Sequence, residues 1–435
     1  MKYVILIGDG MADYPIPEHG NRTALQIAST PNLDFIATEG ICGLVKTIPE
    51  GMGAGSDIAI LSILGYGPAQ YYTGRGPLEA MGMHIPLDEE DIALRCNLIT
   101  EKEGRIEDFS GGHITTEEAS ALMEALNEEF RDKWASKGWE LTFHPGVSYR
   151  NVLVIKPKSK DDDLWEGKEI GCVPPHDVIG ALIEENLPKE EMLRDVMITS
   201  KRILAGHEVN ARRMARNARK ANMVWLWSGG KKPVLPAFSA LYGVHGSVIS
   251  GVNLIKGIGR CMGLDIIEVP GATGYIDTNY EGKAEYALRS LEDKNFVLVH
   301  VEAPDEAAHL GDIAMKVKAI EDFDALVVGT VLKGLEQKFA DTEEGYRILV
   351  MPDHYTPVSV GTHTKEAVPF AIYDSQAHRG KEGGVREKGK EKEKEGGFDE
   401  LSALKSGLGV LDAGAQDLMR LFFKGRFNVN EARKN

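Results

Sequence analysis

The chain begins MKYVILIGDGMAD (residues 1–13), and this stretch predicts the fold class. Tyr3 to Ile7 form a short, continuous apolar run that ends in Gly-Asp-Gly. Such a run is typical of a parallel strand buried on both faces and followed by a turn at its carboxyl end. Ligands of open α/β sheets bind at that edge, so Asp9, between two glycines that permit close approach, is a candidate functional carboxylate.

Three later segments have a similar hydrophobic pattern. Residues 266–269, 296–301 and 347–351 are mostly apolar and are typical of buried strands, with helical stretches between them, which predicts a doubly wound, mainly parallel α/β sheet. Asp305 and His309 follow the second of these runs, and Asp353 and His354 follow the third. Because parallel strands end at the same edge of a sheet, we expect these side chains to lie near Asp9.

The middle of the chain has a different pattern, with strands and helices of its own. We therefore expect a discontinuous metal-binding domain over 1–84 and 231–435, with a second α/β (α+β) cap domain over 85–230 inserted into it. Within the insert, the sequence predicts a helix over 178–185 and a turn at 228–230. The charged, low-complexity segment 380–397 is predicted to be a disordered loop.

Bulk composition excludes some classes of partner. The net charge of −16 over 435 residues argues against binding to nucleic acid or to a membrane surface, although local basic pockets remain compatible with a small phosphorylated substrate. The four cysteines form no C-x-x-C pair, and no signal peptide or membrane span is predicted, so we expect a cytoplasmic protein with reduced thiols. A homo-oligomer is compatible with this composition.

Seven polar residues have the chemistry of a two-metal phosphoryl-transfer site. They are Asp9, Ser56, Asp305, His309, Asp353, His354 and His363. Carboxylates and imidazoles bind divalent cations, and a serine beside a cation becomes a stronger nucleophile. Each residue also has an ordinary interpretation: Asp305 and His309, four apart, fit a surface pair, Ser56 fits a helix N-cap, and His363 fits a solvated loop.

The order of these residues resembles the alkaline phosphatase superfamily, and most closely the archaeal-type branch of the cofactor-independent phosphoglycerate mutases. The resemblance covers nearly the whole chain. Its motifs are IGDGMAD (7–13), TPNLD (30–34), GSDIA (55–59), LGYGPAQYYTGRGPLEA (64–80), PGATGYIDTNYEGKAE (270–285), VEAPDEAAHLGD (301–312) and MPDHYTPVSVGTHT (351–364).

This resemblance implies a fold, a reaction and roles for named residues. It implies an alkaline-phosphatase-like fold and interconversion of 2- and 3-phosphoglycerate, in glycolysis and gluconeogenesis, without 2,3-bisphosphoglycerate. Ser56 would be the phosphorylated nucleophile at two divalent ions, Mn²⁺ first and Mg²⁺, Co²⁺ or Zn²⁺ as substitutes. One ion would bind Asp305, His309 and His363, and the other Asp9, Ser56, Asp353 and His354. His113 lies in a segment, 110–113, that resembles the family's Gly-Gly-x-His substrate loop, so it is a candidate substrate contact. From their own chemistry Arg150, Lys231, Lys232 and Lys256 are candidate anion contacts, and each lysine equally fits a solvated surface residue.

Two alternatives remain open from sequence. The stretch ANMVWLWSGGKKP (221–233) resembles a bacterial sub-branch for which homoserine has been proposed as the phosphoryl acceptor, so a homoserine-kinase-like transferase or a phosphatase would keep the same metal site. A catalytically inactive α/β binding protein is the alternative from another class, and the presence of all seven site residues argues against it.

Overall fold

The computed structural model describes residues 1–159, 170–339, 342–378, 396–406, 408–412 and 417–424. The contacts between residues divide the chain into two compact units, Met1–Tyr71 with Leu235–Asn435, and Tyr72–Val234. We call them the sheet unit and the inserted unit. The charged segment 380–397 lies outside the described residues except for its last two positions.

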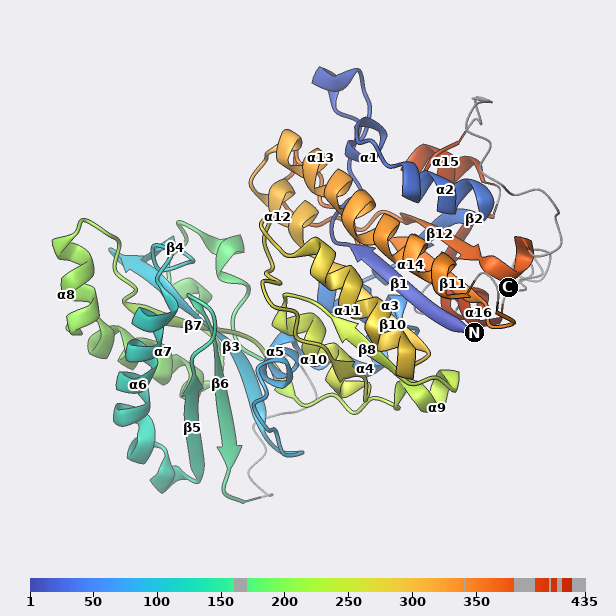
Figure 1. Ribbon diagram of the computed structural model, residues 1–435. Helices are drawn as coiled ribbons and strands as arrows, with labels where there is room; N and C mark the ends of the chain where they lie inside the picture. The colour runs from blue at the N-terminus through green and yellow to red at the C-terminus, as the bar shows by residue number, and fades with distance from the viewer. Residues whose placement is uncertain (160–169, 340–341, 379–395, 407, 413–416, 425–435) are drawn as a thin grey trace. The chain divides into compact units, whose positions relative to one another are not determined.

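The sheet unit is built on one eight-stranded sheet (Figure 1). Its strand order is β13-β2-β12-β11-β1-β10-β8-β9. The strands are β1 (Lys2–Gly8), β2 (Ile41–Lys46), β8 (Gly246–Ile249), β9 (Asp265–Ile266), β10 (Phe296–Val301), β11 (Tyr346–Met351), β12 (Val368–Asp374) and β13 (Val410–Asp412). All neighbouring pairs are parallel except those that β12 makes with β11 and β2, which confirms the predicted mainly parallel α/β sheet.

Helices cover both faces of this sheet. They are α1 (Ala24–Ile27), α2 (Pro31–Glu39), α3 (Ser56–Ile63), α4 (Pro68–Tyr71), α9 (Phe238–Tyr242), α10 (Asn253–Cys261), α11 (Tyr280–Asp293), α12 (Ala303–His309), α13 (Ile313–Asp322), α14 (Gly329–Phe339), α15 (Glu400–Lys405) and α16 (Asp417–Lys424). Along β1, Val4 and Leu6 join one core cluster with residues of α2, α11, α13 and α14. Tyr3, on the opposite face, contacts Phe422 and Phe423 of α16. Because both faces are covered, the run from Tyr3 to Ile7 is apolar without a break.

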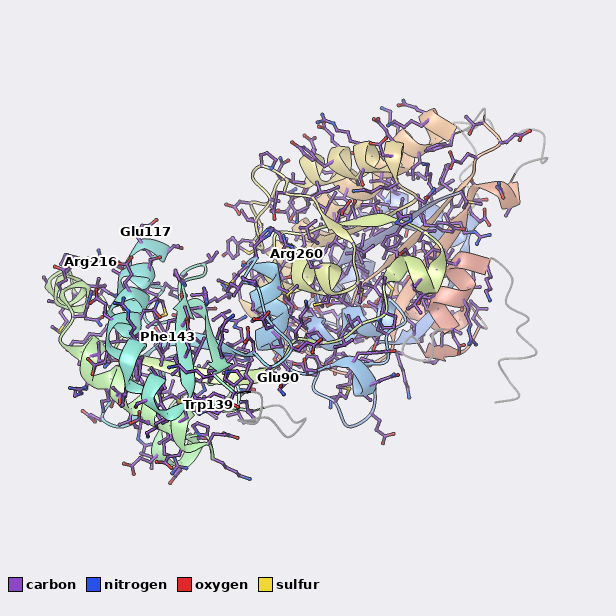
Figure 2. The ribbon with its side chains drawn as sticks, turned by 90° about the horizontal axis from the view of Figure 1, so that it is seen from below. Glu90, Glu117, Trp139, Phe143, Arg216 and Arg260 are labelled. Carbon is purple, nitrogen blue, oxygen red and sulfur yellow. The ribbon has the colours of Figure 1, made fainter. Side chains whose placement is uncertain are left out.

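The inserted unit has a five-stranded antiparallel sheet in which β3 pairs with β4, β6 and β7, and β6 pairs with β5. Its elements are α5 (Arg75–Gly82), β3 (Ile92–Lys102), β4 (Arg105–Asp108), α6 (Thr116–Lys133), β5 (Trp139–His144), β6 (Arg150–Pro157), α7 (Glu191–Ala205), α8 (Glu208–Ala215) and β7 (Met223–Lys231). Phe143 of β5 packs on Phe130 of α6 (Figure 2). The core therefore lies between this sheet and its helices.

The division at residues 72 and 234 differs from the boundaries 85 and 230 expected from sequence. The difference arises at α5, which packs on β3 and β7 of the inserted unit. A side chain at Gly76 would meet the backbone carbonyl oxygen of Ala93 at 2.3 Å, so this glycine lets the helix lie directly against the strand.

Two local expectations inside this unit were wrong. The segment 228–230 is not a turn but belongs to β7, where a Cβ on Gly229 would lie 2.5 Å from the side chain of Leu94. Gly229 therefore serves close packing between strands rather than chain reversal. The expected helix at 178–185 is absent, because Gly180 adopts a φ of 80° that an α-helix does not allow.

Candidate metal centre

Three adjacent strands deliver the acidic side chains of the site. β10, β1 and β11 are parallel neighbours in the centre of the sheet. Asp9 directly follows β1, Asp305 follows β10 on the short helix α12, and Asp353 follows β11. The carboxyl ends of these strands meet at one edge, so three carboxylates distant in sequence come together as predicted.

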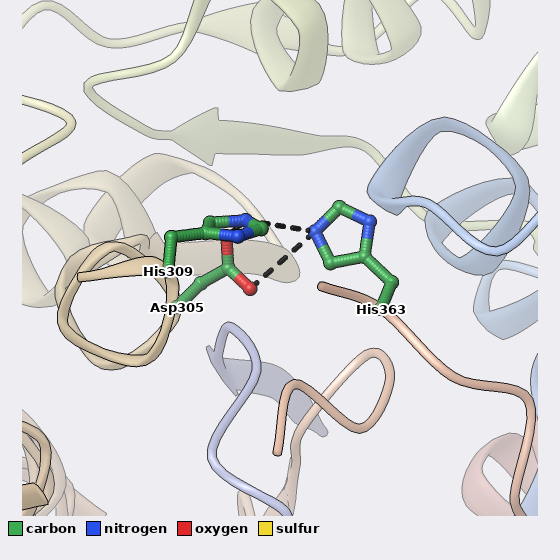
Figure 3. Close-up of side chains that lie close together, drawn as sticks. All are labelled: Asp305, His309 and His363. Atoms are coloured by element: carbon green, nitrogen blue, oxygen red, sulfur yellow. Dashed lines mark hydrogen bonds and ion pairs between the residues drawn. The ribbon is translucent and has the colours of Figure 1, made fainter. Parts of the chain in front are cut away.

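Asp305, His309 and His363 form the first cluster (Figure 3). Asp305 Oδ2 lies 3.0 Å from His309 Nε2, and Asp305 Oδ1 lies 3.5 Å from His363 Nε2. The two imidazole Nε2 atoms are 3.1 Å apart. The spacing of four residues places Asp305 and His309 on one face of α12, and His363 reaches them from the loop after β11.

Asp9, Asp353 and His354 form the second cluster, and Ser56 lies beside it. The Ser56 Oγ atom is 3.3 Å from Asp9 Oδ2 and 3.1 Å from His354 Nε2. Ser56 is the first residue of α3 and its hydroxyl makes no capping bond, since Gly55 occupies the N-cap position. The N-cap interpretation of Ser56 is therefore wrong, and its hydroxyl faces the cluster instead.

Thr356 links the two clusters and determines which nitrogen of His354 carries a proton. The Thr356 hydroxyl donates to Asp305 Oδ1 at 2.5 Å, and His354 Nδ1 lies 3.2 Å from Thr356 Oγ1. Because the hydroxyl proton is already used, His354 Nδ1–H must be the donor to Thr356 Oγ1. His354 Nε2 is then unprotonated and faces Asp9 and Asp353, as a metal ligand must.

The buried carboxylates test whether these residues fit a cation. Asp9 and Asp353 are fully buried, yet Asp9 Oδ1 and Asp353 Oδ2 have no hydrogen-bond partner among the described residues. Burial raises the pKa of Asp9 well above its ordinary value, and the charge of Asp353 raises it further. Unpaired buried carboxylate oxygens are costly unless a positive charge satisfies them, so the donor set fits divalent cations.

The first cluster has different electrostatics because its two imidazoles share one carboxylate. Burial lowers the pKa of His309, but its hydrogen bond to Asp305 and the charge of Asp305 outweigh burial and raise the pKa to about 9. Burial is the largest influence on Asp305, but the charge of His363 and the hydrogen bonds to both imidazoles hold its pKa well below the ordinary value. A cation at this cluster would displace the His309 proton.

The structure adds residues that sequence reasoning missed. His300 of β10 and Glu302 after it form a third group with Asp9, in which one ligand atom from each lies within 4.8 Å of the others. Thr356 was missed as well. The sequence carried one signal for His300, an imidazole within the otherwise apolar strand FVLVHV, but a strand histidine is more often a satisfied core residue.

The five expected substrate contacts lie outside these clusters. Lys256 is on α10 in the sheet unit and pairs with Glu268 at 2.5 Å. The other four belong to the inserted unit: Lys231 pairs with Glu90 at 2.6 Å, and His113, Arg150 and Lys232 are exposed. Their role in binding a substrate stays a prediction.

Two further arginines near the predicted Arg150 were missed in the inserted unit. Arg95, in the middle of β3, and Arg75, at the start of α5, both pair with Glu79. Burial raises the pKa of Glu79, but the charges of Arg95, Arg75 and Arg150 overcome burial and lower it. Three guanidinium groups therefore act on the charge of one carboxylate.

Comparison with known proteins extends over the whole chain. A family model described as 2,3-bisphosphoglycerate-independent phosphoglycerate mutase matches residues 37–210. The protein of that name from Methanosarcina barkeri is 47% identical over 429 residues, which cover 98% of this chain and 100% of that protein. Its namesake from Methanothrix thermoacetophila is 45% identical over 428 residues, again 98% and 100% of the two chains.

Solved structures agree with this assignment. A Pyrococcus horikoshii protein superimposes with a TM-score of 0.75 at 28% identity, covering 98% of each chain. The cofactor-independent phosphoglycerate mutase of Thermoplasma acidophilum gives a TM-score of 0.59 at 28% identity, covering 97% of this chain and 100% of that one. In sequence and in fold, the chain belongs to the family of 2,3-bisphosphoglycerate-independent phosphoglycerate mutases.

Proposed function

We propose that this protein interconverts 3-phosphoglycerate and 2-phosphoglycerate through a phosphoserine at Ser56, without 2,3-bisphosphoglycerate. The single observation that carries the mechanism is the position of the Ser56 hydroxyl, within 3.3 Å of both Asp9 and His354 at the edge of the sheet. The names of the relatives favour a mutase over the kinase or phosphatase alternatives.

The two clusters would hold two divalent cations, for which Mn²⁺ is our first choice. Asp305, His309 and His363 would hold one cation. Asp9, Ser56, Asp353 and His354 would hold the other. Mixed carboxylate and imidazole ligands suit Mn²⁺, and also admit Mg²⁺, Co²⁺ or Zn²⁺. When bound, the cations favour the deprotonated serine and neutralise charge on the phosphoryl oxygens.

The reaction then needs two in-line displacements. Ser56 Oγ attacks phosphorus, the bond from phosphorus to the 3-oxygen breaks, and phosphoserine and glycerate remain. Glycerate reorients and its 2-hydroxyl attacks the same phosphorus, so that the bond to Ser56 breaks and 2-phosphoglycerate leaves. His113 is our candidate for passing the proton between the two glycerate oxygens.

The inserted unit supplies features suited to an anionic substrate. The charges of Arg95, Arg75 and Arg150 all lower the pKa of Glu79, and guanidinium groups match carboxylates and phosphates. Among the described residues, Arg95 Nε is buried without a hydrogen-bond partner. We propose that this arginine cluster binds glycerate or its phosphate, with Lys231, Lys232 and Lys256 as further anion contacts.

The loop that carries His113 is held in an unusual conformation. Gly111, Gly112 and His113 all have positive φ, at 58°, 66° and 49°. Arg213 donates to the carbonyl oxygens of both glycines, at 2.8 and 2.9 Å. A non-glycine residue is held in the left-handed region only when its surroundings impose it, and such residues cluster at functional sites.

Water must be excluded while Ser56 is phosphorylated, because hydrolysis would convert the mutase into a phosphatase. We propose that the inserted unit closes over the sheet edge for this purpose.

An assay with 3-phosphoglycerate and Mn²⁺, without ATP or 2,3-bisphosphoglycerate, tests the function. Formation of 2-phosphoglycerate without free phosphate supports it, and Ser56→Ala should abolish the conversion. An ATP requirement or stoichiometric phosphate release would contradict it.

A further inference from the structure

His300 is a fully buried polar residue in the apolar strand β10. In the sheet it pairs in register with Ile7, two residues before Asp9. On its other side β8 ends at Ile249, and Ser250 follows. Ser250, His300 and Asp9 therefore lie across the carboxyl ends of three adjacent parallel strands.

Hydrogen bonds connect these three side chains in a line. The Val252 N–H donates to Ser250 Oγ at 3.0 Å, Ser250 Oγ lies 3.2 Å from His300 Nδ1, and His300 Nε2 lies 2.9 Å from Asp9 Oδ2. Asp9 would be ionised as a metal ligand, and an ionised carboxylate only accepts, so His300 Nε2 carries the proton.

The direction of the bond between Ser250 and His300 follows from the other partner of the serine hydroxyl. Ser250 Oγ already accepts from the Val252 N–H, so its own O–H remains to donate to His300 Nδ1. His300 Nδ1 therefore accepts from the Ser250 hydroxyl.

This line of hydrogen bonds leaves the two oxygens of Asp9 in different states. Oδ2 accepts from His300 at 2.9 Å, and the Ser56 Oγ atom lies 3.3 Å from it. Oδ1 has no hydrogen-bond partner among the described residues and lies 3.5 Å from the unprotonated His354 Nε2. Only Oδ1 is available to a cation without breaking a hydrogen bond.

We infer that His300 and Ser250 are positioning residues that hold Asp9 so that it offers Oδ1 alone to the metal of the second cluster. The inference rests on the proposed role of Asp9 as a metal ligand. It assigns a function to two residues that touch neither substrate nor metal.

A competing possibility is that His300 is itself a ligand, since Asp9, His300 and Glu302 could together surround a third ion. That would require an unprotonated Nε2 and would break the bond to Asp9 Oδ2. The number of bound ions separates the two possibilities.

The test is a Mn²⁺ titration of the full-length protein, with free Mn²⁺ followed by electron paramagnetic resonance. We expect two ions in the wild type. His300→Ala should weaken one of the two affinities by about 10- to 100-fold, the usual effect of removing a residue that orients a ligand, and leave the other unchanged. Ser250→Ala should weaken the same affinity less, and His300→Gln, which keeps an N–H at the ε position, should restore most of it.

Ser290→Ala is the matched control, because it removes a hydroxyl whose one side-chain bond among the described residues is to Ser247, at the opposite end of β8. The inference would be overturned if both His300→Ala and Ser250→Ala kept the wild-type Mn²⁺ affinities. It would also be overturned if the wild type bound three ions and His300→Ala bound two. The titration contains no phosphoglycerate, so it tests the positioning role separately from mutase activity. If the variants show the expected losses of Mn²⁺ affinity but the wild type has no mutase activity, the proposed function is wrong and the positioning role stands. A wild type that binds no Mn²⁺ would contradict both.

Discussion

The imidazole rings of His354 and His363, which belong to different clusters, lie with their centroids 4.1 Å apart. The two candidate cation sites are therefore adjacent, and Thr356 hydrogen-bonds to a ligand of each. Two cations this close can act on one phosphoryl group, which is the arrangement that the proposed reaction requires.

Thr356→Val should weaken Mn²⁺ binding by about 10- to 100-fold, because valine keeps the shape of threonine but leaves Asp305 Oδ1 and His354 Nδ1 without this partner. Mn²⁺ titration measures the effect. The control is Thr47→Val, which removes a buried hydroxyl that has no hydrogen-bond partner in the part of the chain that the structure describes. Wild-type affinity in Thr356→Val would show that the link between the clusters has no role in binding.

Asp353→Asn should stabilise the metal-free protein while it impairs metal binding. The neutral amide removes one of two repelling buried carboxylates, and its oxygen can still accept from the Gly10 and His354 amides. We expect a gain of about 1–3 kcal/mol in the free energy of unfolding, the usual cost of an unsatisfied buried group.

Denaturant unfolding in EDTA and in Mn²⁺ measures both halves of this prediction. The wild type should be stabilised by Mn²⁺ through mass action, and the variant much less. A metal-free variant less stable than the wild type would contradict the account of these carboxylates.

Mn²⁺ binding at the first cluster should release a proton at neutral pH. The hydrogen bond and charge of Asp305 overcome burial and raise the pKa of His309 to about 9, so this imidazole is protonated in the metal-free protein at pH 7. Affinity should rise with pH up to about 9 as the competing proton is lost. Calorimetry in two buffers of different ionisation enthalpy counts the protons, and binding without proton release would refute the assignment.

Whether the sequence predicted the role of a residue depended on where that residue lies in the fold. Asp9 and Asp353 end apolar strands, so their place at the sheet edge followed from the strand pattern. His300 and Arg95 were missed because each lies within a buried strand, where a polar residue has no local sign of its partner. Gly229 was misread as a turn residue because its close contact with Leu94 comes from strand pairing, which a single sequence does not reveal.

Glu400→Gln should remove a pH dependence of stability. Burial raises the pKa of Glu400 from 4.5 to about 7, although Asp13 N–H and the Thr23 hydroxyl bond to its carboxylate. The folded state thus binds this proton more tightly, so the stabilisation is complete below pH 4.5 and is lost as the pH rises through 7.

Relative to the variant, the wild type should lose at most about 3 kcal/mol of unfolding free energy across this range, at 1.36 kcal/mol per pKa unit. Denaturant unfolding at several pH values measures the difference, with the exposed Glu50→Gln as a control. Parallel pH profiles for Glu400→Gln and the wild type would contradict the prediction.

The central claim is that the phosphoryl group passes through Ser56. The most direct measurement is acid quenching of the Mn²⁺-loaded protein during turnover of 3-phosphoglycerate, followed by mass spectrometry of the peptide that contains Ser56. We predict phosphate on Ser56 in the wild type, formed without ATP, and neither phosphopeptide nor 2-phosphoglycerate in Ser56→Ala. Conversion of 3- to 2-phosphoglycerate by Ser56→Ala at the wild-type rate would contradict the account.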